Sequence, residues 1–256
     1  MHDNLVYVPF HVEQGNLQKA IAGAYSLNVL GLNVTVPYKQ AVIPCLDCVE
    51  GLAEKIGAVN TLVRTENGFL GYNTDMMGLY RAMEEEGIAF EAEDMILLGA
   101  GGAARAAAFL CAEKGAKRVY LLNRSYEKAA VLAEEVNRAY ERDCILPMAL
   151  SEYEKLPEEK MTAIQGTSAG LYPNTEDAVI LDPAFYQHIS KAYDLIYKPE
   201  ETRFMKLVKE AGGEAYCGIR MLLYQGIIAY ELFLDTKVPE NVIRKVSALL
   251  QEKVKG

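Results

Sequence analysis

Residues 95–105 read Met95-Ile96-Leu97-Leu98-Gly99-Ala100-Gly101-Gly102-Ala103-Ala104-Arg105, an apolar strand followed by a glycine-rich loop and the start of an alanine-rich helix. In such a loop Gly99 permits a tight turn, and Gly101 lets the backbone approach a pyrophosphate. Ala104 is small enough for helix and strand to pack closely. The helix that begins after Gly102 offers unpaired backbone N–H groups to phosphate oxygens. This context predicts a dinucleotide-binding loop; the alternative is a strand-to-helix turn with only a structural role.

Apolar strands and helices alternate on both sides of this loop, which is typical of a parallel, doubly wound sheet. We expect strands at residues 95–98, 119–122, near 145 and 163, at 192–196 and at 214–217. We expect helices at residues 76–86, 103–114, 126–140 and 202–210.

The residues before 76 follow a different pattern. We expect a strand at 5–12, helices at 17–24 and 42–49, and a hairpin of 59–63 with 69–72 around Asn67-Gly68. Two closing helices, 219–233 and 240–253, are not followed by another parallel strand, so we expect them to return to the first domain. The predicted fold is α/β, with a discontinuous first domain (residues 1–75 and 218–256) and a Rossmann-type dinucleotide-binding domain (residues 76–217).

The amino-acid composition argues against some classes of function, such as nucleic-acid binding and membrane insertion. The chain has 256 residues, 51% apolar, and 26 basic against 35 acidic side chains, a net charge of -9. Nucleic acid binding needs clustered basic residues in excess, so small molecules are the expected partners. The first residues do not resemble a signal peptide, and the most apolar stretch, 219–234, contains charged residues. We expect a cytoplasmic protein without a membrane span and with reduced cysteines.

Cys45 and Cys48 form a CxxC motif, which raises the alternative of a zinc or redox site. No second cysteine pair or histidine cluster accompanies the motif in the sequence. We therefore expect no metal site.

The end of the strand expected at 119–122, the second in the dinucleotide-binding domain, indicates which dinucleotide is bound. An NAD-specific protein places Asp or Glu there for the ribose hydroxyls, whereas this chain has Asn123-Arg124-Ser125, with Lys128 one turn on. Arg124 can pair with a phosphate that a carboxylate would repel. NADP is favoured over NAD; the alternative is that Arg124 is an ordinary surface arginine.

Two turn-rich loops ahead of the glycine loop carry one basic and one acidic side chain: Asn33-Val34-Thr35-Val36-Pro37-Tyr38-Lys39 and Gly71-Tyr72-Asn73-Thr74-Asp75. A Lys and an Asp beside a dinucleotide can handle a proton while the cofactor handles a hydride, as a carbonyl/alcohol oxidoreductase requires. Alternatively, Lys39 is a solvated lysine and Asp75 an N-cap of the helix beginning at Met76.

Seven segments together resemble the shikimate dehydrogenase family, which includes shikimate and quinate dehydrogenases. They are residues 33–39, 58–61, 71–75, 99–106, 123–125, 194–199 and 218–225. The resemblance implies reversible, NADP-dependent reduction of 3-dehydroshikimate to shikimate in aromatic amino-acid biosynthesis. It also implies a monomer or homodimer whose N-terminal domain binds the substrate.

The resemblance also implies roles for single residues. Lys39 and Asp75 match the catalytic pair. Residues that match substrate-binding positions are Thr35, Asn60, Tyr197 and Gln225. Residues that match cofactor-binding positions are Gly99, Gly101, Gly102, Ala103, Asn123, Arg124, Ser125, Lys128, Thr167, Gly218 and Met221.

Three features depart from the family pattern. The His-Ser-x-Ser-Pro motif that grips the substrate carboxylate is absent, and we expect the sequence to be a shortened one. Gln165-Gly166-Thr167-Ser168 stands where the family usually has Asn-Ala or Asn-Thr before a Thr. The chain also contains no Trp. Two alternatives therefore stay open: an enzyme that also oxidises quinate or prefers NAD, and a non-catalytic sensor of a pathway metabolite.

Overall fold

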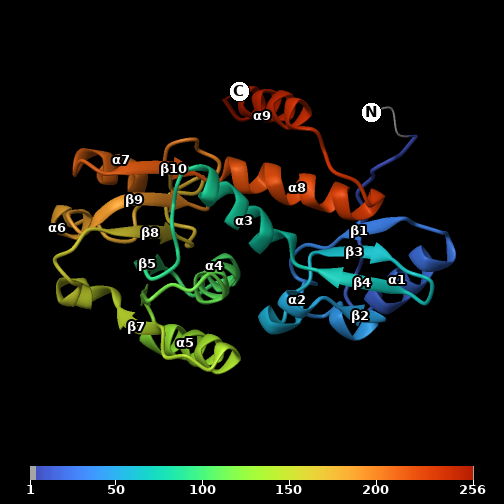
Figure 1. The fold of residues 1–256 in the computed structure, drawn as a ribbon, viewed down its shortest axis with the longest axis horizontal. Helices are drawn as coiled ribbons and strands as arrows, with labels where there is room; N and C mark the ends of the chain where they lie inside the picture. Colours follow the sequence, from blue (N-terminus) through green and yellow to red (C-terminus); the bar gives the residue numbers. More distant parts are fainter. Residues whose placement is uncertain (1–3, 256) are drawn as a thin grey trace. The chain divides into compact units, whose positions relative to one another are not determined.

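The computed structural model describes residues 4–255. The chain divides into two compact units, Met1–Asn73 and Thr74–Gly256, which we call the N-terminal and C-terminal units (Figure 1). Residues 218–256 fall in the C-terminal unit, because helix α8 (Ile219–Leu234) packs along helix α3 (Thr74–Glu85) there. The assignment of these residues to the substrate-binding domain stays a prediction.

The N-terminal unit is built on a four-stranded sheet of order β1-β3-β4-β2. The strands are β1 (Gly31–Asn33), β2 (Cys48–Val49), β3 (Thr61–Arg64) and β4 (Phe69–Tyr72), and the helices are α1 (Leu17–Ser26) and α2 (Gly51–Ile56). The expected hairpin is confirmed, since β3 and β4 pair antiparallel. The buried core of this unit contains Ile21, Val42, Ala53, Val59, Leu62 and Phe69.

Two expectations for this unit are wrong. Residues 5–12 form no strand, and the side chains of Val6 and Phe10 are 86% and 76% exposed. A strand needs a partner for its backbone groups, and β-rich composition does not supply one. The helix expected at 42–49 is instead a short 3-10 helix, Ile43–Cys45, followed by β2, which pairs with β4.

The C-terminal unit contains a six-stranded, all-parallel sheet of order β10-β9-β8-β5-β6-β7, so the doubly wound prediction is confirmed. Its strands are β5 (Asp94–Leu98), β6 (Arg118–Asn123), β7 (Ile145–Ala149), β8 (Met161–Gln165), β9 (Ile189–Asp194) and β10 (Glu214–Cys217). The strand order reverses between β5 and β8. In open sheets of this kind, ligands bind at that reversal, outside the carboxyl ends of the strands.

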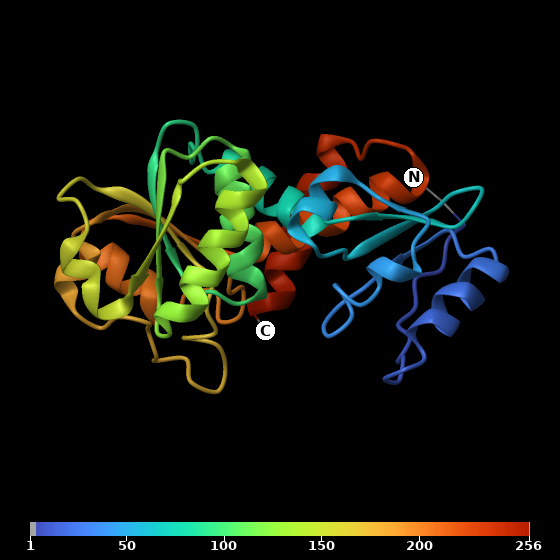
Figure 2. The same ribbon diagram turned by 90° about the horizontal axis from the view of Figure 1, so that it is seen from below.

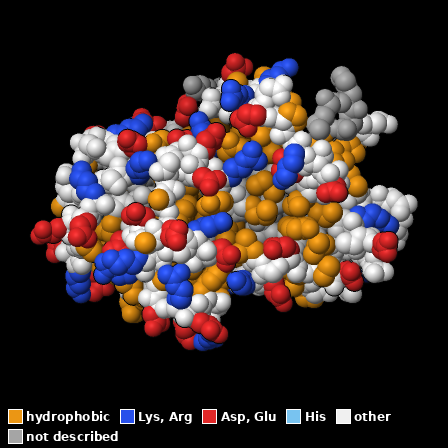
Figure 3. All heavy atoms as spheres, viewed as in Figure 1, with side chains coloured by type: hydrophobic (Ala, Val, Ile, Leu, Met, Phe, Trp, Pro, Cys, Tyr) orange, Lys and Arg blue, Asp and Glu red, His pale blue; other side chains and the backbone are white. Residues whose placement is uncertain are grey.

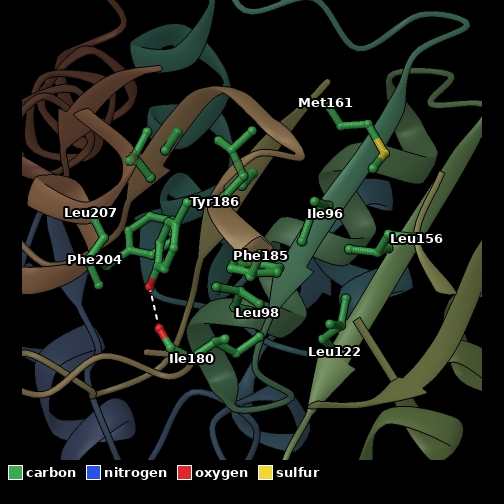
Figure 4. Packing of buried hydrophobic residues seen from close by; sticks show 14 of the residues in the cluster. Ile96, Leu98, Leu122, Leu156, Met161, Ile180, Phe185, Tyr186, Phe204 and Leu207 are labelled. Atoms are coloured by element: carbon green, nitrogen blue, oxygen red, sulfur yellow. Dashed lines mark hydrogen bonds between the residues drawn. The ribbon is translucent and has the colours of Figure 1, made fainter. Parts of the chain in front are cut away.

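Helices cover both faces of this sheet. Figure 2 shows α4 (Gly102–Glu113) and α5 (Tyr126–Tyr140) on one side of the strands and α7 (Arg203–Glu210) on the other. The short helices α6 (Pro183–Tyr186) and η2 (Leu150–Lys155) complete the α7 side. Alternate strand residues such as Ile96 and Leu98 pack there against Phe185, Tyr186 and Phe204 (Figure 4). The Tyr186 hydroxyl donates to the carbonyl of Ile180, so this buried aromatic core keeps its polar group paired.

Three further helices of the C-terminal unit lie beyond the sheet: α3 (Thr74–Glu85), α8 (Ile219–Leu234) and α9 (Glu240–Lys255). The helices α3 and α8 pack along each other, and α9 packs on α8. Their salt bridges include Arg220 with Glu85 and Glu86, which join the start of α8 to the end of α3.

Candidate dinucleotide and substrate site

The glycine-rich loop follows β5 and opens α4, as expected. Gly99 has φ +104°, a backbone conformation that residues with a side chain rarely adopt. Its N–H donates to the Leu122 carbonyl of β6 at 2.9 Å. Gly101 is the N-cap of α4, and no side chain caps this helix. A Cβ on Gly101 or Gly102 would meet nothing within 4 Å. The uncapped N–H groups beside open space fit the pyrophosphate of a dinucleotide.

The carboxyl end of β6 carries the residues expected to select NADP. Arg124 and Lys128 are exposed, and Ser125 is half-buried. The side chain of Asn123 donates to the carbonyl of Ser125 at 2.8 Å, and the Ser125 hydroxyl accepts from Lys128 N–H at the start of α5. Local hydrogen bonds thus shape this turn and leave two cationic side chains in solvent, which fits a 2′-phosphate.

The loop after β8 approaches the glycine-rich loop. A Cβ on Gly99 would lie 2.7 Å from Cγ2 of Thr167, so the Thr167 methyl group occupies the place where Gly99 has no side chain. Thr167 is half-buried and Ser168 is exposed. The structure therefore brings Thr167 and the glycine-rich loop together.

Gly218 begins α8 directly against the end of β9. A Cβ there would lie 2.7 Å from the carbonyl carbon of Leu195 and 3.1 Å from the Asp194 oxygen, so only glycine fits. The Gly218 N–H donates to the Ile196 carbonyl at 3.0 Å. Tyr197 follows on the same β9 segment and is 43% exposed. This contact between backbones places Gly218 next to the segment that carries Tyr197.

Asp75, Met221 and Gln225 lie on the paired helices α3 and α8 of the C-terminal unit. Asp75 lies in the first turn of α3, which begins at Thr74, so it is not the N-cap of a helix beginning at Met76. A Cβ on Gly78 would lie 2.7 Å from the Gln225 nitrogen and 3.0 Å from the Met221 carbonyl oxygen. Asp75 precedes Gly78 by one helical turn. All three candidate residues are half-buried.

Thr35, Lys39 and Asn60 gather in the N-terminal unit. Val34 N–H donates to the Asn60 carbonyl at 2.8 Å, and Val59 N–H donates to the Lys39 carbonyl at 2.8 Å. Both ends of the loop that carries Thr35 and Lys39 are therefore anchored at residues 59 and 60. Asn60 is buried, and its amide oxygen accepts from the Thr61 hydroxyl at 3.1 Å.

Metal-binding clusters and membrane-spanning helices are two other features by which a function could be recognised. Within residues 4–255, no group of three or more His, Cys, Asp or Glu side chains could hold a metal ion. No helix in the described part of the chain is long and apolar enough to cross a membrane. On the face drawn in Figure 3, acidic and basic side chains are interspersed.

Family models match three successive parts of the chain. They are the shikimate dehydrogenase substrate binding domain at residues 1–62, shikimate / quinate 5-dehydrogenase at residues 82–173, and the shikimate 5'-dehydrogenase C-terminal domain at residues 218–246. The chain belongs to the shikimate dehydrogenase family.

Individual relatives of this shikimate dehydrogenase family member agree with that assignment. The shikimate dehydrogenase (NADP(+)) of Desulforamulus reducens is 40% identical over 250 residues, which cover 95% of this chain and 84% of the relative. The crystal structure of a shikimate dehydrogenase in complex with NADP+ superposes with a TM-score of 0.85 at 32% identity, covering 97% of this chain and 85% of that one. A quinate dehydrogenase from Corynebacterium glutamicum, in complex with NAD, gives a TM-score of 0.81 at 29% identity, covering 92% of this chain and 83% of that one.

Two buried polar residues beside the candidate site were assigned no role from the sequence. Gln165 and Asp194 end β8 and β9 side by side in register, and both side chains are 0% exposed. The Asp194 carboxylate accepts from Ile196 N–H at 2.9 Å and from the Thr202 hydroxyl at 2.6 Å, and burial raises its pKa to about 7. Part of the signal was present in the sequence, since Gln165 directly follows Ala163 and Ile164, and Asp194 directly follows Ala192 and Tyr193.

Proposed function

We propose that this chain is an NADP-dependent shikimate dehydrogenase that reversibly reduces 3-dehydroshikimate to shikimate in aromatic amino-acid biosynthesis. Membership of the family over three successive domains carries the proposal. The relative from Desulforamulus reducens is named for the same activity and the same cofactor. The uncapped start of α4 beside Gly101 and Gly102, together with exposed Arg124 and Lys128, supports NADP as the cofactor.

The cofactor site comprises the glycine-rich loop with Gly99, Gly101, Gly102 and Ala103, the turn at the end of β6, and Thr167. Gly218 and Met221 lie at the start of α8, and the pliant thioether of Met221 allows a flat ring to approach. Bound NADPH supplies the hydride for the reduction. The residues of the turn after β6 that hold the adenosine side are Asn123, Arg124, Ser125 and Lys128.

Lys39 and Asp75 serve the proton side of the reaction. Negative charge grows on the carbonyl oxygen as the ketone is reduced, and the Lys39 ammonium stabilises that charge and delivers a proton. Asp75 is the acidic member of this proposed catalytic pair. Thr35, Asn60 and Gln225 hydrogen-bond the ring hydroxyls, and Tyr197 lines the site.

A quinate-oxidising enzyme is the second candidate, because the quinate dehydrogenase from Corynebacterium glutamicum has the same fold. Purified protein is incubated with NADP+ or NAD+ and with shikimate or quinate, and absorbance at the reduced-nicotinamide band is followed. We expect the highest kcat/KM for shikimate with NADP+. Reduction of the dinucleotide with quinate but not with shikimate would favour the second candidate. No turnover with either substrate would favour a metabolite sensor.

We further propose that the enzyme works in the cytoplasm as a monomer or homodimer. The five cysteines are free thiols in the structure, which is usual in a reducing compartment. Light scattering coupled to size-exclusion chromatography determines the oligomeric state.

A further inference from the structure

Gln165 ends β8 where the strand order of the parallel sheet reverses. It pairs in register with Leu98 of β5 and with Asp194 of β9. Its side chain is 0% exposed. A buried amide that lacks partners is costly, so the partners of this side chain show what it is for.

The Gln165 side-chain amide forms hydrogen bonds to a single short segment, residues 166–170, which we call the β8 loop. Its Oε1 accepts from Thr167 N–H, and its Nε2 donates to the carbonyl oxygens of Ala169 at 3.1 Å and Thr167 at 3.5 Å. The Thr167 hydroxyl oxygen accepts from Ala169 N–H at 3.1 Å. One side chain thus supplies both a donor and an acceptor to a loop without regular structure of its own.

The β8 loop lies in direct contact with the glycine-rich loop. A Cβ on Gly166 would lie 2.9 Å from both Cα and Cβ of Ala104 on α4, and a Cβ on Gly99 would lie 2.7 Å from Cγ2 of Thr167. Contacts this short are not tolerated, and the Ala104 atoms belong to a helix that cannot move like a flexible side chain. Glycine at position 166 therefore sets how closely the β8 loop approaches the start of α4.

We propose that Gln165 is a positioning residue for the dinucleotide: it holds the β8 loop so that Thr167 closes on Gly99 beside the phosphate-binding turn, at a separation that Gly166 permits. This rests on the proposed function, because it takes the glycine-rich loop as the NADP site. The Thr167 N–H is occupied by Gln165 and the Thr167 hydroxyl oxygen accepts from Ala169 N–H, so Thr167 can offer the cofactor its hydroxyl hydrogen as a donor.

The test compares Gln165→Ala with the wild-type full chain. The dissociation constant of NADPH is measured by nucleotide fluorescence, alongside kcat, the KM for shikimate and the melting temperature. We expect NADPH to bind about tenfold more weakly, with a KM for shikimate that changes by less than about twofold. Gln187→Ala is the matched control, because Gln187 is exposed at the end of α6, and it should leave all four values unchanged.

Two further variants keep the test decisive if Gln165→Ala does not fold. Gln165→Asn is too short to reach both bonding partners, and Gly166→Ala pushes the β8 loop away from Ala104; each should weaken NADPH binding. Their effects should be less than additive in the double variant, because both disturb the same loop.

The outcomes separate this inference from the proposed function. A folded variant with a lower melting temperature but an unchanged NADPH dissociation constant would show a merely structural role and overturn the inference. A wild-type protein that does not bind NADPH would overturn the proposed function itself.

Discussion

Gly78 of α3 lies in backbone contact with Gln225 of α8: a Cβ at position 78 would be 2.7 Å from the Gln225 nitrogen. The two helices touch at this position without any intervening side chain. Asp75 lies one turn before Gly78, and Gln225 is a proposed substrate-binding residue. The absence of one methyl group therefore sets the separation of two helices that carry proposed site residues.

Replacing Gly78 by Ala should push α3 and α8 apart. We expect the free energy of unfolding to fall by about 1–3 kcal/mol and kcat/KM for shikimate to fall with it, because the new methyl group overpacks a contact between backbones. Urea unfolding and steady-state assays measure the two effects. Gly226→Ala on the partner helix α8 is the control, since a Cβ there meets nothing within 4 Å. If Gly78→Ala were as stable as that control, the contact would not be as close as described.

Lys39→Ala should abolish most of the turnover. We expect kcat to fall by roughly two to four powers of ten, because the variant lacks the proposed proton donor, while NADPH still binds. The NADPH dissociation constant and kcat are measured on the same preparation. Lys19→Ala, an exposed position on α1, should behave as wild type. Turnover within a factor of about two of wild type in Lys39→Ala would exclude this lysine as the proton donor.

Arg124→Asp should reverse the preference between the two dinucleotides. The new carboxylate would repel the 2′-phosphate of NADP and could accept from the ribose hydroxyls of NAD. We expect the ratio of kcat/KM for NADP+ to that for NAD+ to fall by at least about tenfold. Arg138→Asp, near the far end of α5, is the control. An unchanged ratio would mean that Arg124 does not contact the phosphate.

Asp194 should make stability depend on pH. Burial raises the pKa of this carboxyl to about 7 in the folded protein, above the value near 4 of an unfolded chain. Between these values the folded state holds a proton that the unfolded state has lost, so stability decreases as pH rises through this range and is flat above it. The loss between pH 5 and pH 8 is on the order of 2 to 3 kcal/mol.

Asp194→Asn removes this titration, so the free energy of unfolding of the variant should change less between pH 5 and pH 8 than that of the wild type. Urea unfolding at the two pH values measures it, and Asp143→Asn, an exposed position, is the control. Parallel pH profiles for wild type and Asp194→Asn would show that Asp194 does not hold a proton in the folded state near neutral pH.

The C-terminal unit was predictable from local pattern. The helix expected at 126–140 is α5, Tyr126–Tyr140, and the apolar runs expected as strands are β5 to β10. The inner strands β5, β6 and β8 are buried along most of their length, so each one is visible as an apolar run. In the N-terminal unit β1 and β2 have only three and two residues, too few for a pattern, and the strand expected at 5–12 found no partner.

The candidate site was predicted in part. Several parts of the site are contiguous in sequence, so each can be recognised from its residue types. They are the glycine-rich loop, the turn at Arg124, and the motifs with Lys39 and Asp75. The roles of Gln165 and Asp194 depend on hydrogen bonds that close local loops and on the parallel register that sets the two residues side by side. Neither the register nor the bonds follow from residue type.

The sequence by itself determined where glycine is needed for the turn after β5, which helices and strands alternate around it, and which family the motifs resemble. These properties follow from backbone freedom and from the spacing of apolar residues along the chain. The tertiary structure alone decided that Gly78, Gly166 and Gly218 stand against a neighbouring backbone. A close approach is a property of two segments at once, so the local sequence around each of these glycines does not show which backbone will lie against it.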